Sequence, residues 1–388
     1  MNKRINIILI ALVIPLAFLF SSCENIIFGP EGGKLPEPKM YSSRFNTVLD
    51  SLRYALDVPA LAGAIVTDSG IIYSGAVGCR RYGGAENVTV TDRFHLGSCS
   101  KSFTAVLIGI LVDEGLINWN KTLPEIFPEY KNTMRDEYKN VNISDILCHG
   151  AGFMRDYNSL TFHSINPKEK RLEIVAWALL QPPAQQRGQY LYSNMGFIIA
   201  GAIVEKLTNR SYEELLMEKV IRPLDLTTAG FGTMGTEGIE DQPLQHTVNH
   251  APIIASPVAG LDATYNPAGG LYMSIGDWGK YIQWVMKAES GQSQSLLTSA
   301  TAKKITSGGV YSGSGSYYAF GWGIGNADWA GGKSMNHSGS NGFNYSTVAI
   351  SCARHYAILV MSNQGAIGEE WPLGPAFWRL LDFYQKGN

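Results

Sequence analysis

The chain has 388 residues, 45% of them hydrophobic, which suits a globular protein with one large folded unit. Its 31 Lys and Arg residues nearly balance 33 Asp and Glu residues, and the charges form no long run of one sign. Proteins that bind nucleic acids need a basic surface, so this balance excludes nucleic acid as a partner.

The first 22 residues are predicted to be an export signal that does not belong to the fold. Lys3 and Arg4 precede an apolar run from Ile7 to Phe20 that is too short to span a membrane. The run ends in Leu-Phe-Ser-Ser-Cys, which resembles a bacterial lipoprotein signal, with Cys23 as the lipid-carrying residue. We therefore expect an exported bacterial lipoprotein, anchored to a membrane through Cys23 and facing the periplasm or the cell surface. Because Phe20 replaces the usual aliphatic residue, ordinary cleavage and an uncleaved anchor are the alternatives.

Residues 23–40 are predicted to be a tether, because they are rich in Gly and Pro and show no apolar periodicity. The folded domain is expected to occupy residues 41–388. Its first signal is in residues 61–78, where two short apolar runs flank Asp68-Ser69-Gly70 and predict a β-hairpin. A helix that is apolar nearly all round, and therefore buried, is predicted from Ser98 to about residue 115.

The middle of the chain, residues 116–270, is expected to form a mainly helical lobe. Apolar residues recur every three or four positions in 143–152, 168–180 and 196–221, which predicts helices. Ser144 and Asp145 are candidate caps for the first of these helices.

The last part of the chain changes to strand-like patterns. Short runs rich in aromatic and β-branched residues occupy 317–325, 346–352 and 356–363, and an amphipathic helix follows at 374–385. We therefore predict an α+β fold, in which an antiparallel sheet formed from both chain ends (41–115 and 271–388) is flanked by helices and carries the helical lobe as an insertion. A site is expected between the two lobes.

Ser98 and Lys101 are three residues apart at the start of the buried helix. Residues with that spacing share a helix face, so the ammonium group can reach the hydroxyl. Burial would desolvate Lys101 and lower its pKa, and a neutral lysine can accept the hydroxyl proton. The pair predicts a nucleophilic serine at a helix N-terminus, which favours developing negative charge. The alternative is that Ser98 merely caps the helix.

A second candidate is Tyr192-Ser193-Asn194, which precedes a buried helix. A phenol can shuttle protons, and an amide can both donate and accept hydrogen bonds. The same Tyr-x-Asn pattern occurs at 130–132 and 138–140, in a charged segment that is expected to be solvated. Only the third occurrence is therefore predicted to be functional.

The third candidate is His337-Ser338-Gly339-Ser340, at the end of a predicted strand. Gly339 would let a substrate backbone approach closely. The backbone N–H of Ser340 would join that of Ser98 in binding an oxyanion. A lone histidine is more often structural, so His337 is a functional candidate only together with the other two motifs.

These three motifs, in this order, resemble those of the serine hydrolases related to class C β-lactamases. DD-peptidases, D-aminopeptidases and family VIII carboxylesterases belong to the same group. The flanking segments 192–227 and 266–282 also resemble the family, and the likeness covers roughly residues 45 to 385.

The resemblance implies a β-lactamase/transpeptidase-like fold and a covalent acyl-enzyme formed on an amide or ester, either a D-amino-acid peptide, a β-lactam or a small ester. It implies that Ser98 is the nucleophile and that Lys101 and Tyr192 move protons, without deciding which of them is the general base. It makes Asn194, His337, Gly339 and Ser340 substrate-binding residues. No cofactor is implied.

Two departures from the family pattern qualify this interpretation. The β-lactamases usually carry Lys-Thr-Gly at the third motif, where the lysine helps to hold the substrate carboxylate, but this chain has His337-Ser338-Gly339. Histidine is charged only part of the time near pH 7, so the variant favours peptide or ester hydrolases over efficient β-lactamases. The segment 147–153 also lacks the Thr-Ser that relatives often show between His149 and the following glycine. A non-catalytic binding or sensor protein on the same fold is the alternative function.

Other reaction classes find little support in the sequence. The Gly-x-Ser-x-Gly motif of α/β-hydrolases does not occur, and His246 and His250 lack the glutamate of the zinc protease motif. The cysteines after Cys23 are not closely spaced and are expected to be small buried side chains, not metal ligands; they are Cys79, Cys99, Cys148 and Cys352.

Overall fold

The computed structural model describes residues 43–386, apart from 158–161, 257–258, 293–294 and 366–371. The predicted export signal, Cys23 and the predicted tether lie outside the described residues. Within the described ranges, no helix combines the length and the apolar character needed to cross a bilayer.

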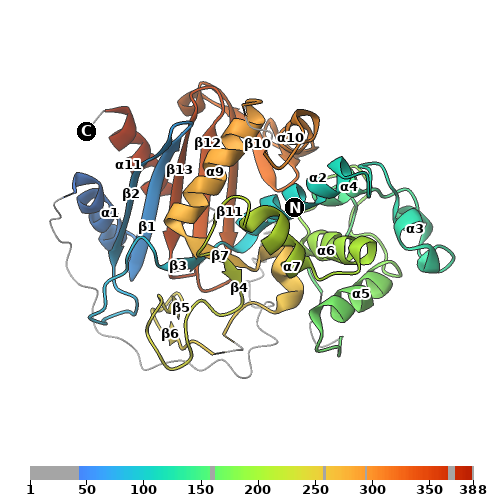
Figure 1. Ribbon diagram of the computed structural model, residues 1–388, viewed down its shortest axis with the longest axis horizontal. Helices are drawn as coiled ribbons and strands as arrows, with labels where there is room; N and C mark the ends of the chain where they lie inside the picture. Colours follow the sequence, from blue (N-terminus) through green and yellow to red (C-terminus); the bar gives the residue numbers. More distant parts are fainter. Residues whose placement is uncertain (1–42, 158–161, 257–258, 293–294, 366–371, 387–388) are drawn as a thin grey trace, which may run out of the picture.

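An eight-stranded antiparallel sheet forms the centre of the fold (Figure 1). The hairpin predicted at 61–78 is present, and its first strand pairs with the last strand of the chain, with Leu61 opposite Ser362. The sheet is thus built from both chain ends, which confirms the predicted α+β class. In spatial order the strands are β2 (Gly70–Gly78), β1 (Ala60–Thr67), β13 (Tyr356–Ser362), β12 (Tyr345–Ser351), β11 (Gly332–Ser340), β10 (Trp322–Ala327), β9 (Ser316–Ala319) and β8 (Val310–Gly313).

Helices cover both faces of this sheet, and β1, β12 and β13 are accordingly buried along nearly their whole length. Successive side chains of a strand point to opposite faces. Ala62 and Ala64 therefore belong to the core that contains Trp278 of α9, whereas Leu61 and Ile65 belong to a second core under the two terminal helices. Figure 1 shows α9 on one face and α1 and α11 on the other. These helices are α9 (Ile275–Glu289), α1 (Arg44–Ala55) and α11 (Gly374–Gln385), and the short α10 (Ser299–Ile305) follows α9.

The remaining helices form a group beside the sheet (Figure 1). The predicted buried helix is α2, whose residues from 100 to 111 are all buried. Of the two caps predicted for residues 143–152, Asp145 takes part and Ser144 does not: Asn142 is the N-cap of α4, and the Asp145 carboxylate accepts the Asn142 N–H at 3.0 Å in a capping box. The bounds are α2 (Ser100–Asp113), α3 (Leu123–Ile126), α4 (Ile143–Leu147), α5 (Pro167–Ala178), α6 (Asn194–Thr208), α7 (Tyr212–Leu216), a π-helical turn (Met217–Ile221) and α8 (Asn266–Gly269).

Two small sheets complete the described structure. β3 (Arg93–His95), β7 (Leu271–Ser274) and β4 (Gly230–Phe231) form one, and β5 (Gln245–His246) pairs with β6 (Pro252–Ile253) in the other. The first of them matters for the site, because β3 leads directly into the turn that carries Ser98 and β7 follows α8.

Candidate active site

Ser98 lies in a single 3₁₀ turn, Gly97–Cys99, immediately before α2. The sequence predicted a helix from Ser98, so the difference is this tighter first turn. Gly97 has a φ of +49°, a left-handed conformation that glycine adopts without strain. The turn leaves Ser98 half-buried while the residues on both sides of it are buried.

The backbone of this turn is in close contact with the backbone of β11. A Cβ atom on Gly339 would lie 2.1 Å from the Leu96 carbonyl oxygen and 2.5 Å from the Ser98 nitrogen, and one on Gly97 would lie 2.3 Å from the Ser340 nitrogen. The structure thus shows a second reason for a glycine at position 339, beside the predicted approach of a substrate backbone, which stays a prediction. Its missing side chain makes room for the turn that carries Ser98, and the same contact brings the backbone nitrogens of Ser98 and Ser340 close to each other.

Lys101 is fully buried in the first turn of α2, with an exposed fraction of 0%. Its Nζ donates to Ser98 Oγ at 3.1 Å, to Asn194 Oδ1 at 2.7 Å and to the Ala268 carbonyl at 2.6 Å. An ammonium group has three N–H bonds, and these three acceptors use all of them. The predicted contact between Lys101 and Ser98 is present, and two further partners hold the amine in place.

Burial lowers the pKa of Lys101 to about 7, because the charged form loses its hydration. Two neighbouring charges act in opposite directions: the Asp156 carboxylate favours the ammonium form and the Arg155 guanidinium disfavours it. A substantial fraction of Lys101 is therefore neutral at pH 7, and a neutral amine can accept a proton from Ser98.

Tyr192 lies at the entrance to α6, where the predicted turn into a buried helix is present. Lys101 Nζ is 4.9 Å from the centroid of its ring. Burial raises the pKa of the Tyr192 phenol, and a hydrogen bond with Ser98 acts in the opposite direction. The phenol is therefore protonated at neutral pH and can donate its proton, which distinguishes it from the amine of Lys101.

Asn194 is oriented from both ends of its amide. Its Oδ1 accepts from Lys101, and its Nδ2 donates to Asp156 Oδ1 at 2.9 Å. Burial raises the pKa of the Asp156 carboxyl, and this hydrogen bond with Asn194 opposes the shift. One N–H and one lone pair of the Asn194 amide remain for the predicted substrate contact. Sequence reasoning did not find Asp156, because a single carboxylate in a loop carries no pattern.

His149 holds the Tyr192 turn on both sides. Its Nδ1 accepts from the Ser193 N–H at 3.1 Å, and its carbonyl accepts from the Leu191 N–H at 2.9 Å. The two rings also pack together, with centroids 4.3 Å apart between His149 and Tyr192. This residue lies in the segment 147–153, where the sequence shows a departure from the family but no role for the histidine.

His337 is buried at 8% exposure, and both of its ring nitrogens are used. Nδ1 is 2.6 Å from the Ser338 carbonyl, which can only accept, so Nδ1 carries a hydrogen; Nε2 lies 2.8 Å from the hydroxyl of Tyr318. Burial lowers the pKa of His337 to about 3, so the ring is neutral. Both ring nitrogens have protein partners here, so the predicted substrate contact through this imidazole, which stays a prediction, requires a substrate group to replace one of them. Tyr318 was not predicted, since it lies in a strand-like run without a motif.

Ser340 ends β11, and its hydroxyl belongs to the following turn. It donates to the Asn344 carbonyl at 2.8 Å and accepts from the Gly342 N–H at 2.9 Å. The side chain is therefore occupied, and the backbone N–H is the part of Ser340 that faces the Ser98 turn.

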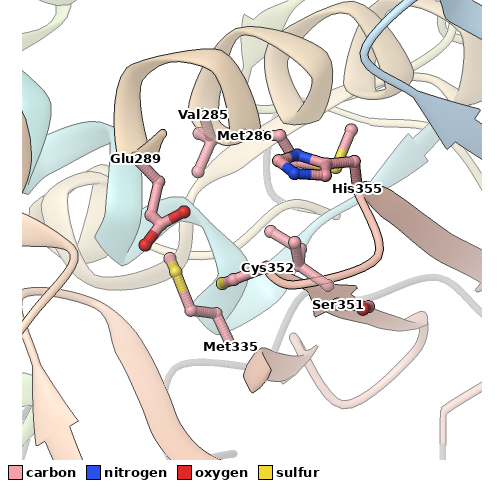
Figure 2. Close-up of a pocket in the computed structure, with 8 residues that line it drawn as sticks. Val285, Met286, Glu289, Met335, Ser351, Cys352 and His355 are labelled. Carbon is pink, nitrogen blue, oxygen red and sulfur yellow. The ribbon is translucent and has the colours of Figure 1, made fainter. Parts of the chain in front are cut away.

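A separate pocket lies under α9 and contains none of the predicted site residues. Figure 2 shows Val285, Met286 and Glu289 from that helix above Met335 and Cys352. The polar groups here have partners, since Glu289 pairs with Lys333 at 2.8 Å and His355 with Asp68 at 3.0 Å. Burial raises the pKa of Cys352 to about 12, which makes its thiol inert near pH 7.

Both histidines considered for zinc contact backbone groups, and His250 Nε2 lies 2.8 Å from the Asp57 carbonyl. His246 Nε2 accepts from the Tyr82 N–H at 3.0 Å, and its Nδ1 is 3.0 Å from the Asn363 carbonyl. Within the described ranges, no group of three His, Cys, Asp or Glu side chains is arranged to hold a metal ion. Cys79, Cys99 and Cys148 are buried free thiols, as expected, whereas Cys352 is half-buried.

Comparisons with known proteins agree with the predicted family. The sequence pattern of the family described as Beta-lactamase matches residues 45–382. Protein flp of Staphylococcus aureus is 22% identical over 308 residues, which are 79% of this chain; the chain spans only 60% of the length of this curated relative. The octameric penicillin-binding protein homologue from Pyrococcus abyssi has a TM-score of 0.71 and 22% identity, over 86% of this chain and 77% of that one. D-alanine carboxypeptidase AmpC from Burkholderia cenocepacia has a TM-score of 0.69 and 18% identity, over 86% and 96%. The two structural similarities confirm the predicted fold, and the match over most of the chain shows that this protein belongs to the beta-lactamase family.

Proposed function

We propose that the protein is a serine hydrolase that cleaves an amide or ester through a covalent acyl-enzyme on Ser98. One observation carries the proposal: a fully buried lysine with a pKa of about 7 places its Nζ 3.1 Å from the Ser98 hydroxyl. A lysine kept only for stability would gain by reaching water, so its burial against a hydroxyl supports a role in proton transfer.

In the first half of the reaction, Ser98 Oγ passes its proton to the neutral Lys101 amine and forms a bond with the substrate carbonyl carbon. The carbonyl oxygen becomes an oxyanion, which the backbone N–H groups of Ser98 and Ser340 stabilise. When the carbonyl re-forms, the bond to the leaving amine or alcohol breaks. The leaving group takes a proton from the Lys101–Tyr192 pair, and Ser98 is left as an ester.

In the second half, water attacks the ester carbonyl while the same pair accepts its proton. The tetrahedral oxyanion collapses, the bond to Ser98 Oγ breaks, and Oγ takes the proton back as the carboxylic acid leaves. The hydrogen bond that joins Lys101 to Asn194 supports this cycle, because it keeps the amine next to Ser98 through both proton transfers.

Labelling with a fluorophosphonate probe tests the proposal. We expect the native protein to be labelled at Ser98 and heat-denatured protein to remain unlabelled. Ser98→Ala is expected to abolish labelling and to lower the melting temperature by no more than about 2–4 °C, because Ser98 is half-buried, provides no helix-cap hydrogen bond, and leaves Lys101 two of its three partners. Equal behaviour of native and denatured protein would favour the non-catalytic binding protein, and a large loss of stability with retained activity would favour a purely structural serine.

To identify the substrate class, we would compare the hydrolysis of short-chain esters, D-Ala-D-Ala peptides and a chromogenic cephalosporin. The mass of the covalent adduct reports both the nucleophile and the accepted acyl group. The neutral His337 supports esters or peptides over β-lactams as the preferred class.

We also propose that the protein is an exported lipoprotein, attached to a membrane through Cys23. The support is the sequence of residues 1–23, with two cations, an apolar run and a small-residue step before the cysteine. Metabolic labelling with a fatty-acid analogue is expected to mark the full chain and not Cys23→Ser, and unlabelled wild-type protein in the soluble fraction would contradict the proposal.

A further inference from the structure

Three basic side chains, Lys101, Arg155 and His337, lie around Ser98, and they differ in whether they can bind a negatively charged group of a substrate. Lys101 has no spare N–H when it is protonated, because its three acceptors are all protein atoms. His337 is neutral and its ring nitrogens are occupied. If Ser98 is the nucleophile, as proposed above, a negative charge on the substrate therefore finds no partner in the first and third motifs.

Arg155 is a third cation next to the same groups, and it is exposed. Its guanidinium lies 5.2 Å from the centroid of the Tyr192 ring, and 64% of its side chain is accessible to solvent. The nearest carboxylate oxygen belongs to Asp156, at 3.7 Å from Nε, which is too long for a hydrogen bond. In the part of the chain that the structure describes, none of its five N–H groups has a hydrogen-bond acceptor.

The backbone of Arg155 is fixed to the site although its side chain is exposed. Its carbonyl accepts from the N–H of Asn194 at 2.8 Å and from that of Met195 at 3.2 Å, at the start of α6. These two bonds tie Arg155 to the helix that carries Asn194, one residue after the Tyr192-Ser193 turn. The point from which the guanidinium extends is thereby fixed beside Tyr192, and the guanidinium lies 5.2 Å from the centroid of that ring.

The geometry points to Arg155 as a specificity-determining residue that binds a carboxylate on the substrate. A guanidinium matches a carboxylate with two parallel N–H···O bonds, and stacking on an aromatic ring leaves its edge free to make them. Asp156 does not compete strongly, because its Oδ1 is held by Asn194 and its contact with Arg155 is long. The site thus prefers an ester or amide that carries a carboxylate near the Tyr192 side of the scissile bond.

The test compares two chromogenic esters of equal length, a p-nitrophenyl monoester of a dicarboxylic acid and the same compound with its free carboxylate methylated. We expect Arg155→Gln to lower the ratio of kcat/KM for the charged over the neutral ester about 10- to 100-fold, the range for a lost charge-assisted hydrogen bond. The loss is expected mainly in KM, to shrink at high salt, and to be partly restored by Arg155→Lys. Arg210→Gln removes the same charge from a surface pair with Glu218 and is expected to keep the wild-type ratio.

An unchanged ratio in Arg155→Gln would overturn the inference, including the case in which both esters lose activity equally. Binding to the Ser98→Ala background separates this result from a failure of the proposed hydrolysis. In that background we measure how much a peptide with a free C-terminal carboxylate raises the melting temperature, and compare it with the same peptide as a C-terminal amide. The difference between the two peptides is expected to depend on Arg155 even when no substrate is turned over. Equal protection by the two peptides, with and without Arg155, would contradict the inference whatever the activity of Ser98.

Discussion

Lys101 is held in an environment that disfavours its own charge, and two neighbours of opposite sign adjust how strongly. Burial supplies the main effect, while Asp156 favours the ammonium and Arg155 disfavours it. Asp156 also orients Asn194, and Arg155 lies over the ring of Tyr192. The two charges that adjust the Lys101 pKa therefore also contact Asn194 and Tyr192.

The protonation state of Lys101 predicts how reactivity depends on pH. The proposed base acts as the neutral amine, which forms as the pH rises through its pKa of about 7. We therefore expect the rate of fluorophosphonate labelling at Ser98 to rise from pH 5.5 to 8 with a midpoint near 7 and then to level off. Asp156→Asn removes a charge that favours the ammonium, so its midpoint is expected at lower pH. Arg155→Gln removes a charge that disfavours it, so its midpoint is expected at higher pH. Shifts of both variants in the same direction, or no pH dependence in the wild type, would exclude Lys101 as the titrating base.

At the scale of elements, the site depends on how closely the Ser98 turn meets β11 and β12. Three contacts join them: Gly339 leaves space for the turn, the Cys99 thiol donates to the His337 carbonyl at 3.5 Å, and the Ser346 hydroxyl donates to the Leu96 carbonyl at 2.7 Å. The oxyanion site that we propose consists of backbone groups from both sides of this contact. Its geometry is therefore set by the distance between two elements and not by one side chain.

Gly339→Ala tests that dependence. The added methyl would lie 2.1 Å from the Leu96 carbonyl oxygen, so the turn has to move away from β11. A displacement of about 1 Å at a reacting group costs on the order of 100-fold in rate, and overpacking costs about 1–3 kcal/mol of stability. We expect labelling of Ser98 to slow by about that factor in protein that is still folded by circular dichroism. Gly276→Ala in α9 is the control, because its nearest neighbour is 3.9 Å away and alanine suits a helix. Wild-type labelling in Gly339→Ala would show that the close contact is not needed.

The elements that the sequence predicted well are those with short-range apolar patterns. The hairpin at 61–78, the strands at 346–352 and 356–363 and the helix at 374–385 all appear within two residues of their expected ends. The juxtaposition of Ser98 with Lys101 followed from helical spacing alone, since it requires only one turn.

The parts of the site that sequence reasoning missed are those created by tertiary contacts. Asp156, His149 and Tyr318 reach the site from a loop, a helix end and a strand that no local pattern connects. The hydrogen bond to His337 Nε2 likewise comes from Tyr318, which is two strands away in the sheet, and burial keeps the ring neutral. The motifs therefore indicated which residues are candidates. Their protonation states and hydrogen-bond partners depend on tertiary neighbours and could not be predicted from the sequence.

The whole molecule joins its two chain ends in one sheet, and the two sides of that sheet serve different purposes. Ser98 and α2 belong to the side where α9 packs, whereas α1 and α11 cover the other side. Both terminal helices pack on Gly63 of β1, where an added Cβ would lie 2.9 Å from Leu49 of α1 and 3.4 Å from Leu380 of α11. The terminal helices therefore close the core that does not carry the site.

This division predicts that stability and reactivity can be separated by substitutions in α11. Leu380 is fully buried, and truncation to alanine is expected to cost about 2–5 kcal/mol, because the methyl groups it loses leave a cavity between α11 and β1. The same change at Leu116, which is 47% exposed, is expected to cost less than about 0.5 kcal/mol and is the matched control. Denaturant unfolding measures both values, and the rate of Ser98 labelling is compared well below the melting temperature. Because the sheet separates Leu380 from Ser98, we expect Leu380→Ala to melt earlier and yet to be labelled at the wild-type rate while it is folded. Slow labelling of the folded variant would mean that the two faces of the sheet are coupled, and that the terminal helices help to position the Ser98 turn through β1, β13 and β12.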